Sequence, residues 1–407
     1  MKRRTRFTTT LLLAACLCLP GLLAAQTKSP EIEALERFFT AETIEADWFA
    51  QVFLDQVPAS QLMPVRQQVT TGLGAFQRAE PDPSGQGYRA IFEKGHIPST
   101  ISLDGEGKIN GLFLRPPVME VSSTQEAIDN LTALGGEVAV LVTRNGEPLH
   151  AVNADVPLAV GSAFKLSILA ALAQAVEEGD LRWEDVHVLG EGDRSLPSGT
   201  LQSWPEGAPI TLYSLAARMI SESDNTATDA LLHALGRDRV EAAAPARNRP
   251  FLSTREAFVL KNPEHADLAD AYEAGGEDTR RQILEKAVGL SLPGASVFTG
   301  EKTVRPGIEW FYSARELCAV MEAVAANPVT RINDGGIASA ADWASVSYKG
   351  GSEPGVLNQT FWLHDQAGND FCVAATRNAD QPFDNTPLFS AMNGLIAALH
   401  RGSPATP

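Results

Sequence analysis

Apolar positions along the chain recur at two spacings, and these divide it into helical and strand segments. Spacings of three and four residues predict helices over 31–40, 46–57, 123–134, 212–220, 227–235, 265–274, 278–289 and 388–400. Alternating or short continuous apolar runs predict strands over 88–92, 99–103, 109–114, 137–143, 148–153, 345–348, 357–364 and 371–376. Strands at both ends of the longer part, with helices between them, predict an antiparallel sheet packed against a helical subdomain.

The order of these elements divides the chain into two α+β units. A length of 407 residues is typical of about two domains. Pro116-Pro117 marks the boundary between a small N-terminal domain, 26–117, and a larger one, 118–407. The element order of the first resembles the cystatin-like or ketosteroid-isomerase-like modules.

Residues 1–25 have the composition of a secretory signal peptide. Four basic residues precede an apolar run over 11–23, and small residues close the segment at 24–25. Cys16 lies in a lipoprotein-like context, but the apolar run continues past it, which favours plain cleavage over a lipid anchor. Arg3-Arg4 resembles a twin-arginine signal, although Phe7 stands one place late. We therefore expect an exported protein, periplasmic or extracellular, with no stable membrane span after cleavage.

Net charge and cysteine content lead to two further expectations, one about binding partners and one about a disulfide. The formal net charge is −17, and removing the four basic residues of the signal peptide changes it to −21. Such an acidic surface disfavours nucleic acid and anionic lipid as partners. Only Cys318 and Cys372 remain after cleavage, so an oxidising compartment permits one disulfide, and two unpaired buried thiols remain the alternative.

The first motif with chemical content is Ser162-Ala163-Phe164-Lys165. A helix starting here places Ser162 and Lys165 on one face, within side-chain reach. The helix start supplies backbone N–H groups near the serine oxygen, and the apolar run over 166–176 buries the lysine. Burial lowers the pKa of a lysine, so a neutral amine is able to accept the serine proton. Taken alone, the pattern is also that of a capping serine beside a solvated lysine.

Two further motifs follow along the chain. Ser223-Asp224-Asn225 stands between two predicted helices, where a polar tripeptide is otherwise an ordinary turn, and Thr226-x-x-Asp229 predicts the cap of the second helix. Lys349-Gly350-Gly351-Ser352 ends the strand that begins at 345, and paired glycines in a strand mark a bulge or a close backbone approach.

In this order, the three motifs resemble those of class A β-lactamases and penicillin-binding proteins, over about 121–400. The resemblance implies that Ser162 is acylated, that Lys165 is its base and that Ser223 relays a proton. It implies that Asn225 binds substrate, that Lys349 binds the substrate carboxylate and tunes Ser223, and that Gly350, Gly351 and Ser352 line the binding strand. The backbone N–H groups of Ser162 and Ser352 would form the oxyanion hole.

The sequence departs from that family in two places. Gly350 stands where the family usually has a Thr or Ser hydroxyl, which puts affinity for ordinary penicillins in doubt. No Glu-x-x-Leu-Asn segment is present, and the nearest glutamate, Glu256, belongs to a capping box that begins at Ser253. We expect Glu256 to be structural, and the helices near 265–274 and 278–289 to be an insertion that covers the cleft. The pattern is similar to β-lactamase-like proteins associated with β-lactam biosynthesis, some of which act as esterases.

These observations lead to an exported serine hydrolase that acts on a small-molecule substrate without metal or cofactor. The natural substrate stays open among a β-lactam, a D-Ala-D-Ala peptide stem and an ester. The chain lacks the Gly-x-Ser-x-Gly and His-Glu-x-x-His patterns of other hydrolases. The rival from another class is a non-enzymatic envelope binding protein that works through its N-terminal domain.

Overall fold

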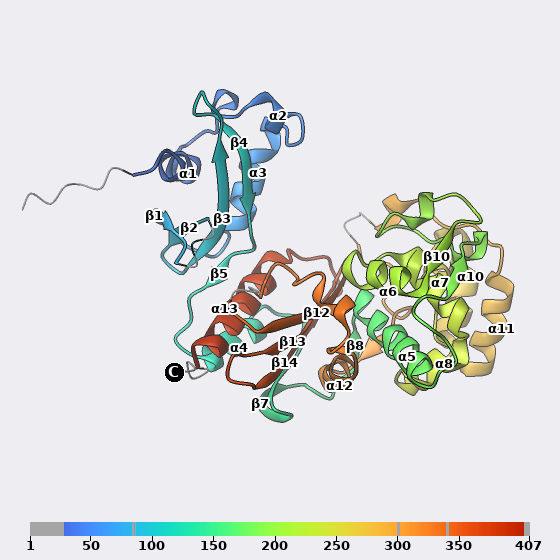
Figure 1. The fold of residues 1–407 in the computed structure, drawn as a ribbon. Helices are drawn as coiled ribbons and strands as arrows, with labels where there is room; N and C mark the ends of the chain where they lie inside the picture. Colours follow the sequence, from blue (N-terminus) through green and yellow to red (C-terminus); the bar gives the residue numbers. More distant parts are fainter. Residues whose placement is uncertain (1–27, 84, 86, 299–301, 339–341, 403–407) are drawn as a thin grey trace, which may run out of the picture.

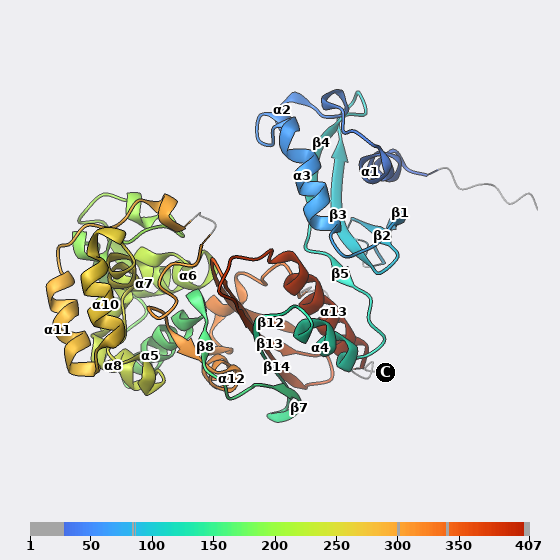
Figure 2. The same ribbon diagram turned by 180° about the vertical axis from the view of Figure 1, so that it is seen from behind.

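The computed structural model describes residues 28–402, apart from 84, 86, 299–301 and 339–341. The predicted signal peptide therefore lies outside the described residues. Figures 1 and 2 show a small N-terminal unit beside a larger one, which is made of a sheet lobe and a helical lobe. Three apolar cores stabilise these parts: one in the N-terminal unit, one on one face of the larger sheet, and one that fills the helical lobe and extends to the other face of that sheet. The chain is an α+β protein, as the sequence predicts.

The N-terminal unit packs helices against an antiparallel sheet of strand order β1-β2-β3-β4, with β5 beside β3. Its elements are α1 (Pro30–Thr40), α2 (Gln51–Leu54), α3 (Ala59–Thr70), β1 (Phe76–Pro81), β2 (Tyr88–Phe92), β3 (Gly95–Leu103), β4 (Ile109–Leu114) and β5 (Val118–Met119). Apolar residues of α1, such as Leu35 and Phe38, are almost completely buried in this core. β5 belongs to this sheet although it follows the predicted boundary at Pro117.

Two predictions are wrong in detail, one in this unit and one at the start of α7 (Asn225–Leu235), and two elements of this unit were missed. α3 and β1 were not predicted. The helix predicted over 46–57 is two short pieces, because Phe49 adopts an extended backbone conformation between η1 (Ala46–Trp48) and α2. At α7 the cap is Asp224, which accepts a hydrogen bond from Ala227 N, and not the predicted Thr226.

The sheet lobe joins the two ends of the larger unit in one antiparallel sheet of order β12-β13-β14-β6-β7. Its elements are α4 (Thr124–Thr132), β6 (Glu137–Arg144), β7 (Glu147–Val152), α12 (Ala314–Val324), β12 (Ser345–Glu353), β13 (Val356–His364), β14 (Asp370–Asn378) and α13 (Thr386–Gly402). α4 and α13 cover one face of the sheet, and α12 packs on the other (Figure 1). β12 is an edge strand, and it continues through both glycines to Glu353 instead of ending at Tyr348 as predicted.

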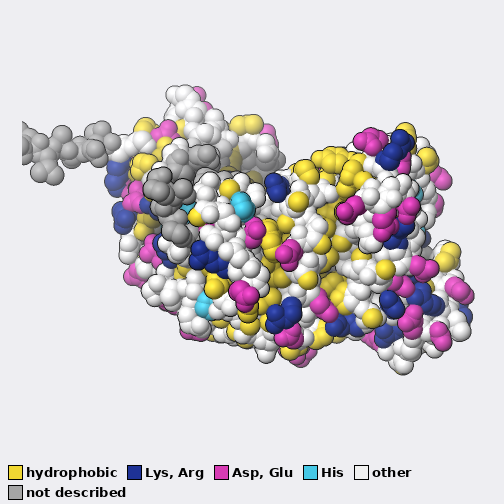
Figure 3. All heavy atoms as spheres, turned by 60° about the horizontal axis from the view of Figure 1, so that its bottom comes forward, with side chains coloured by type: hydrophobic (Ala, Val, Ile, Leu, Met, Phe, Trp, Pro, Cys, Tyr) yellow, Lys and Arg dark blue, Asp and Glu magenta, His cyan; other side chains and the backbone are white. Residues whose placement is uncertain are grey.

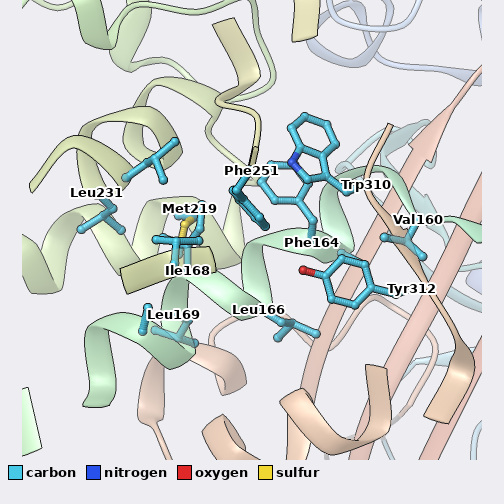
Figure 4. Packing of buried hydrophobic residues seen from close by; sticks show 14 of the residues in the cluster. Val160, Phe164, Leu166, Ile168, Leu169, Met219, Leu231, Phe251, Trp310 and Tyr312 are labelled. Carbon is cyan, nitrogen blue, oxygen red and sulfur yellow. The ribbon is translucent and has the colours of Figure 1, made fainter. Parts of the chain in front are cut away.

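The helical lobe is built around α5, which is buried on nearly all sides. The longer elements are α5 (Lys165–Glu177), α6 (Leu212–Ser221), α7 (Asn225–Leu235), α8 (Arg237–Ala242), α9 (Thr254–Leu260), α10 (Ala266–Ala274) and α11 (Glu277–Ala287). Short elements connect them: β8 (Leu158–Ala159), η2 (Gly161–Phe164), β9 (Val186–Val188), η3 (Glu191–Asp193), η4 (Leu201–Ser203), β10 (Pro209–Thr211), η5 (Ala246–Asn248), η6 (Pro263–His265), η7 (Ala295–Phe298), β11 (Phe311–Tyr312) and η8 (Pro328–Arg331). Figure 4 shows Ile168 and Leu169 of α5 packed near Met219 and Leu231.

One disulfide links α12 to the larger sheet. Cys318 of α12 and Cys372 of β14 form a disulfide, which resolves the alternative that the sequence left open. On the face shown in Figure 3, acidic and basic side chains are interspersed, and apolar side chains gather in a band across the middle. Within the described ranges, no helix is long and apolar enough to cross a bilayer.

Candidate active site

Ser162 lies at the junction of the two lobes, in the short helix η2 that leads into α5. Phe164, in the same turn, stacks on Trp310 with ring centroids 3.7 Å apart (Figure 4). Gly161 adopts a φ of +48°, and a Cβ there would lie 3.0 Å from Ser352 N. A glycine before Ser162 thus allows both the left-handed backbone and the close approach of β12. These contacts hold the serine against the edge of the sheet.

Lys165 is the first residue of α5, and its side chain is completely buried. Its Nζ donates to Ser223 O at 2.6 Å and to Asn225 Oδ1 at 2.6 Å, and it lies 3.2 Å from Ser223 Oγ. Burial, with the nearby charge of Lys349, lowers the pKa of Lys165 well below its usual value. A neutral amine keeps two N–H donors for the two carbonyl oxygens and leaves one lone pair to accept a proton.

The loop before α7 brings Ser223 between the two lysines. Ser223 has a φ of +56°, which is unusual for a residue other than glycine. Behind it, Asp224 is fully buried and accepts hydrogen bonds from Thr200 N and Leu201 N at 2.7 and 2.9 Å. The carboxylate thereby fixes the loop in the conformation that presents the Ser223 hydroxyl.

Lys349 reaches Ser223 from the opposite side. Its Nζ donates to Ser223 Oγ at 3.1 Å and to Gly350 O at 2.6 Å. The side chain is buried, and burial lowers the pKa of Lys349 to about 7. Ser223 Oγ therefore lies within hydrogen-bonding distance of two amines that both lose their proton more readily than a solvated lysine.

Gly351 allows β12 to touch η2. A Cβ on this residue would lie 2.2 Å from Val160 O and 2.4 Å from Ser162 N, so no side chain fits. The backbone nitrogens of Ser162 and Ser352 both lie at this contact. Two backbone N–H groups close to one serine hydroxyl are donors of the kind that a tetrahedral oxyanion needs.

A cavity of about 570 Å³ opens over these residues. The predicted site residues that line it are Ser162, Ser223, Asn225, Lys349, Gly350, Gly351 and Ser352. Lys165 lies behind this surface. The walls are largely apolar and include Phe258, Phe298, Trp310, Leu357 and Phe389. None of the described residues that line the cavity comes from α10 or α11, so the prediction that these helices cover the cleft is wrong.

Asn225 is held by both ends of its amide. The Oδ1 atom accepts from Lys165, and Nδ2 donates to Leu196 O at 3.0 Å. One N–H of the amide remains for a substrate carbonyl. The Asn225 side chain thus holds the Lys165 amine and still has one donor for its predicted role as a substrate ligand.

Glu256 lies outside the cavity. It forms the predicted capping box with Ser253 and binds Arg237 through both carboxylate oxygens, at 2.6 and 3.0 Å. Thr254 faces the cavity instead, with its hydroxyl 2.9 Å from Asp229 Oδ1.

The sequence reasoning missed Asp229 and Thr254. Burial raises the pKa of Asp229 to about 6, although Thr254 and Arg255 donate hydrogen bonds to it. Asp229 follows Asn225 by four residues on α7, and this shared helix face is a signal by which the sequence could have identified it. No local pattern marks Thr254.

A buried ion cluster adjoins the end of β12. Lys261 contacts both Glu309 and Glu353, and Glu353 follows Ser352 and lines the cavity. Burial alone would lower the pKa of Lys261, but the two carboxylates raise it above its usual value. In the described part of the chain, no group of three or more His, Cys, Asp or Glu side chains is arranged to hold a metal ion.

A serine beside buried amines and backbone N–H groups has the groups that serine acyl transfer requires. The chain belongs to the β-lactamase enzyme family, because the model of that family matches residues 123–395. The matched region contains all three motifs and begins after the N-terminal sheet.

Solved structures of low identity resemble the chain. A β-lactamase from Sphaerobacter thermophilus is 20% identical, covering 68% of this chain and 95% of its own, with a TM-score of 0.47. PBP-A is 14% identical, covering 71% and 99%, with a TM-score of 0.44. An ancestral class A β-lactamase is 16% identical, covering 68% and 98%, with a TM-score of 0.46.

One curated relative matches a smaller region. A stretch of 155 residues, 37% of this chain, is 26% identical to the fatty acid synthase beta subunit aflB of Emericella nidulans. The chain spans only 6% of that protein's length.

Proposed function

We propose that the protein is an exported serine hydrolase that forms an acyl-enzyme at Ser162 with β-lactams or related amides and esters. The observation that carries the proposal is the position of Ser223, whose hydroxyl lies 3.2 Å from Lys165 Nζ and 3.1 Å from Lys349 Nζ. A hydroxyl between two buried amines serves to move a proton, and a structural turn has no need of it.

These positions lead to the following sequence of proton transfers during acylation. The neutral Lys165 amine takes the proton of Ser162 Oγ as that oxygen attacks the substrate carbonyl. The backbone N–H groups of Ser162 and Ser352 stabilise the oxyanion. The proton then passes through Ser223 Oγ to the leaving nitrogen or oxygen as its bond to the carbonyl carbon breaks, leaving the acyl group on Ser162.

In the described part of the chain, no base for deacylation is evident. Glu256 is occupied by Arg237 and the start of α9, and the Asp229 carboxylate is occupied by N–H groups of Thr254 and Arg255. General-base assistance contributes about 10²–10⁴ in rate. We therefore expect penicillin turnover to be limited by deacylation, and esters that leave a smaller acyl group to turn over faster because water reaches the carbonyl. The apolar cavity walls also suit such acyl donors.

Export rests on two observations of different kinds. Residues 1–25 have the composition of a signal peptide. The disulfide between Cys318 and Cys372 supports folding in an oxidising compartment, where such bonds persist.

The test is intact-protein mass spectrometry after incubation with benzylpenicillin. The expected result is a persistent mass increase of one penicillin on the wild type. Ser162→Ala should show no mass increase. Lys165→Ala should show almost none, because the two side chains act as one unit. Both variants should keep the wild-type circular dichroism spectrum. Undiminished acylation of either variant refutes the mechanism, and an unlabelled wild type favours a binding protein.

A further inference from the structure

Gly350 stands where the resemblance leads one to expect a hydroxyl side chain, and the structure shows what occupies that space. A Cβ on Gly350 would lie 2.2 Å from the hydroxyl oxygen of Tyr348 and 3.0 Å from Gln359 Nε2. Tyr348 and Gly350 are two residues apart on β12, so they face the same side of the sheet. Gln359 lies directly opposite Gly350 on β13. The phenol oxygen therefore takes the place from which a residue-350 side chain would extend.

The Tyr348 ring is held so that its hydroxyl stays in this place. It packs on Phe361, with ring centroids 4.7 Å apart. The hydroxyl donates to Gln359 Oε1 at 3.0 Å, and Gln359 Nε2 donates to Asn358 O at 2.8 Å. Burial raises the pKa of Tyr348 to about 12, so the phenol keeps its proton at neutral pH. Tyr348 and Gln359 both line the active-site cavity beside Lys349.

We propose that Tyr348 is a specificity-determining residue, whose hydroxyl binds the substrate carboxylate in place of the hydroxyl that Gly350 lacks. The proposal rests on the acyl-transfer function proposed above and names the group that recognises an acidic substrate. A hydroxyl hydrogen rotates freely, and a hydrogen bond to an ionised acceptor is about twice as strong as one to a neutral amide. When a carboxylate binds at the free edge of β12, the Tyr348 hydrogen turns from Gln359 toward it. Lys349, whose side chain leaves the opposite face of this edge strand, supplies the positive charge.

The first test compares benzylpenicillin with its methyl ester, which is the same β-lactam without the negative charge. Acylation rates of the wild type and of Tyr348→Phe are measured with both compounds by intact-protein mass spectrometry. The phenylalanine keeps the ring and loses only the hydroxyl. We expect the rate constant for benzylpenicillin to fall about tenfold and that for the methyl ester to change by less than about twofold. Equal effects on the two compounds, or no effect on either, overturn the proposal.

A matched control separates this effect from the loss of any buried tyrosine hydroxyl. Tyr312 is fully buried, bonds Ser167 Oγ at 2.7 Å and does not line the cavity. Tyr312→Phe should leave the ratio of the two acylation rates unchanged. A shift in this ratio as large as that of Tyr348→Phe counts against a direct contact.

A pair of substitutions tests whether the Tyr348 hydroxyl and a side chain at position 350 occupy the same space. Gly350→Thr alone should slow acylation by both compounds, because the new Cβ collides with the Tyr348 hydroxyl. Gly350→Thr combined with Tyr348→Ala removes the collision and supplies a hydroxyl from the strand itself, so the preference for the free carboxylate should return. If the double variant is acylated yet shows no such preference, the hydroxyl is not the recognition group. Labelling of the wild type by neither compound refutes the acyl-transfer function itself, which is a different outcome.

Discussion

Replacing Lys349 by methionine should stabilise the folded protein at neutral pH while removing its activity. Burial lowers the pKa of Lys349 from 10.5 to about 7. Each unit corresponds to about 1.4 kcal/mol, so the buried amine costs about 5 kcal/mol of folding free energy below pH 7. Methionine has a similar volume and no charge, and it forgoes two hydrogen bonds, to Ser223 and Gly350, at about 1 kcal/mol each. The expected net gain is about 3 kcal/mol at pH 6.

The stability gained by Lys349→Met depends on pH. Between pH 7 and 10.5 the unfolded chain binds a proton at Lys349 that the folded chain does not, so wild-type stability rises with pH in this window. The cost of the buried amine is complete below pH 7 and vanishes above 10.5. The advantage of Lys349→Met should therefore shrink with rising pH and be close to zero near pH 9.

Urea unfolding at pH 6, 7.5 and 9 measures the difference, with circular dichroism as the signal. Lys286→Met is the control, because this lysine lies exposed in the last turn of α11 and its replacement should change stability by less than about 0.5 kcal/mol at every pH. A Lys349→Met variant that is less stable than the wild type at pH 6 refutes the reasoning. So does a gain in stability that stays constant up to pH 9.

Two further substitutions test structural roles. Glu256→Gln should lower the free energy of unfolding by about 1–2 kcal/mol, because it weakens the bond to Arg237 and the helix cap. It should leave the deacylation rate unchanged. Trapped acyl-enzyme in this variant would make Glu256 the deacylation base. Replacing Cys318 and Cys372 together by alanine should lower stability by about 4 kcal/mol, because their bond spans 54 residues. A reductant should then destabilise the wild type alone, and equal sensitivity of both proteins would contradict this.

The fold was predictable from sequence where apolar residues repeat with a clear period. The strands of the larger sheet begin and end within a few residues of the predicted positions, except that β12 extends through its glycines. α3 and β1 escaped prediction because each buries very little: Leu62 is the buried residue of α3, and Ala79 that of β1. Pro64 also interrupts the helical pattern of α3. These elements depend on packing in the N-terminal unit more than on their own sequence pattern.

The candidate site divides in the same way. Residues that belong to short motifs were found from sequence, because each motif keeps its members together along the chain. Tyr348 and Thr254 were not found, because each acts on a segment far from it in sequence or across a strand pair. The two-residue spacing places Tyr348 and Gly350 on one face of β12, but the position of the Tyr348 hydroxyl also depends on Gln359 of β13, a pairing that the sequence does not show.

Three buried lysines show why the structure is needed to separate catalytic amines from structural ones. Lys165, Lys261 and Lys349 are all at most 3% exposed, so burial acts on each of them in the same direction. Lys261 is paired with two carboxylates, and its pKa rises. In the described part of the chain, neither Lys165 nor Lys349 forms an ion pair, and their partners are neutral oxygens, so their pKa values fall. An amine paired with carboxylates keeps its proton, whereas a buried amine without a carboxylate partner loses its proton more readily than a solvated lysine. Because the charge of Lys349 also lowers the pKa of Lys165, the same Lys349→Met change that stabilises the fold should make Lys165 a more firmly protonated, and therefore poorer, base.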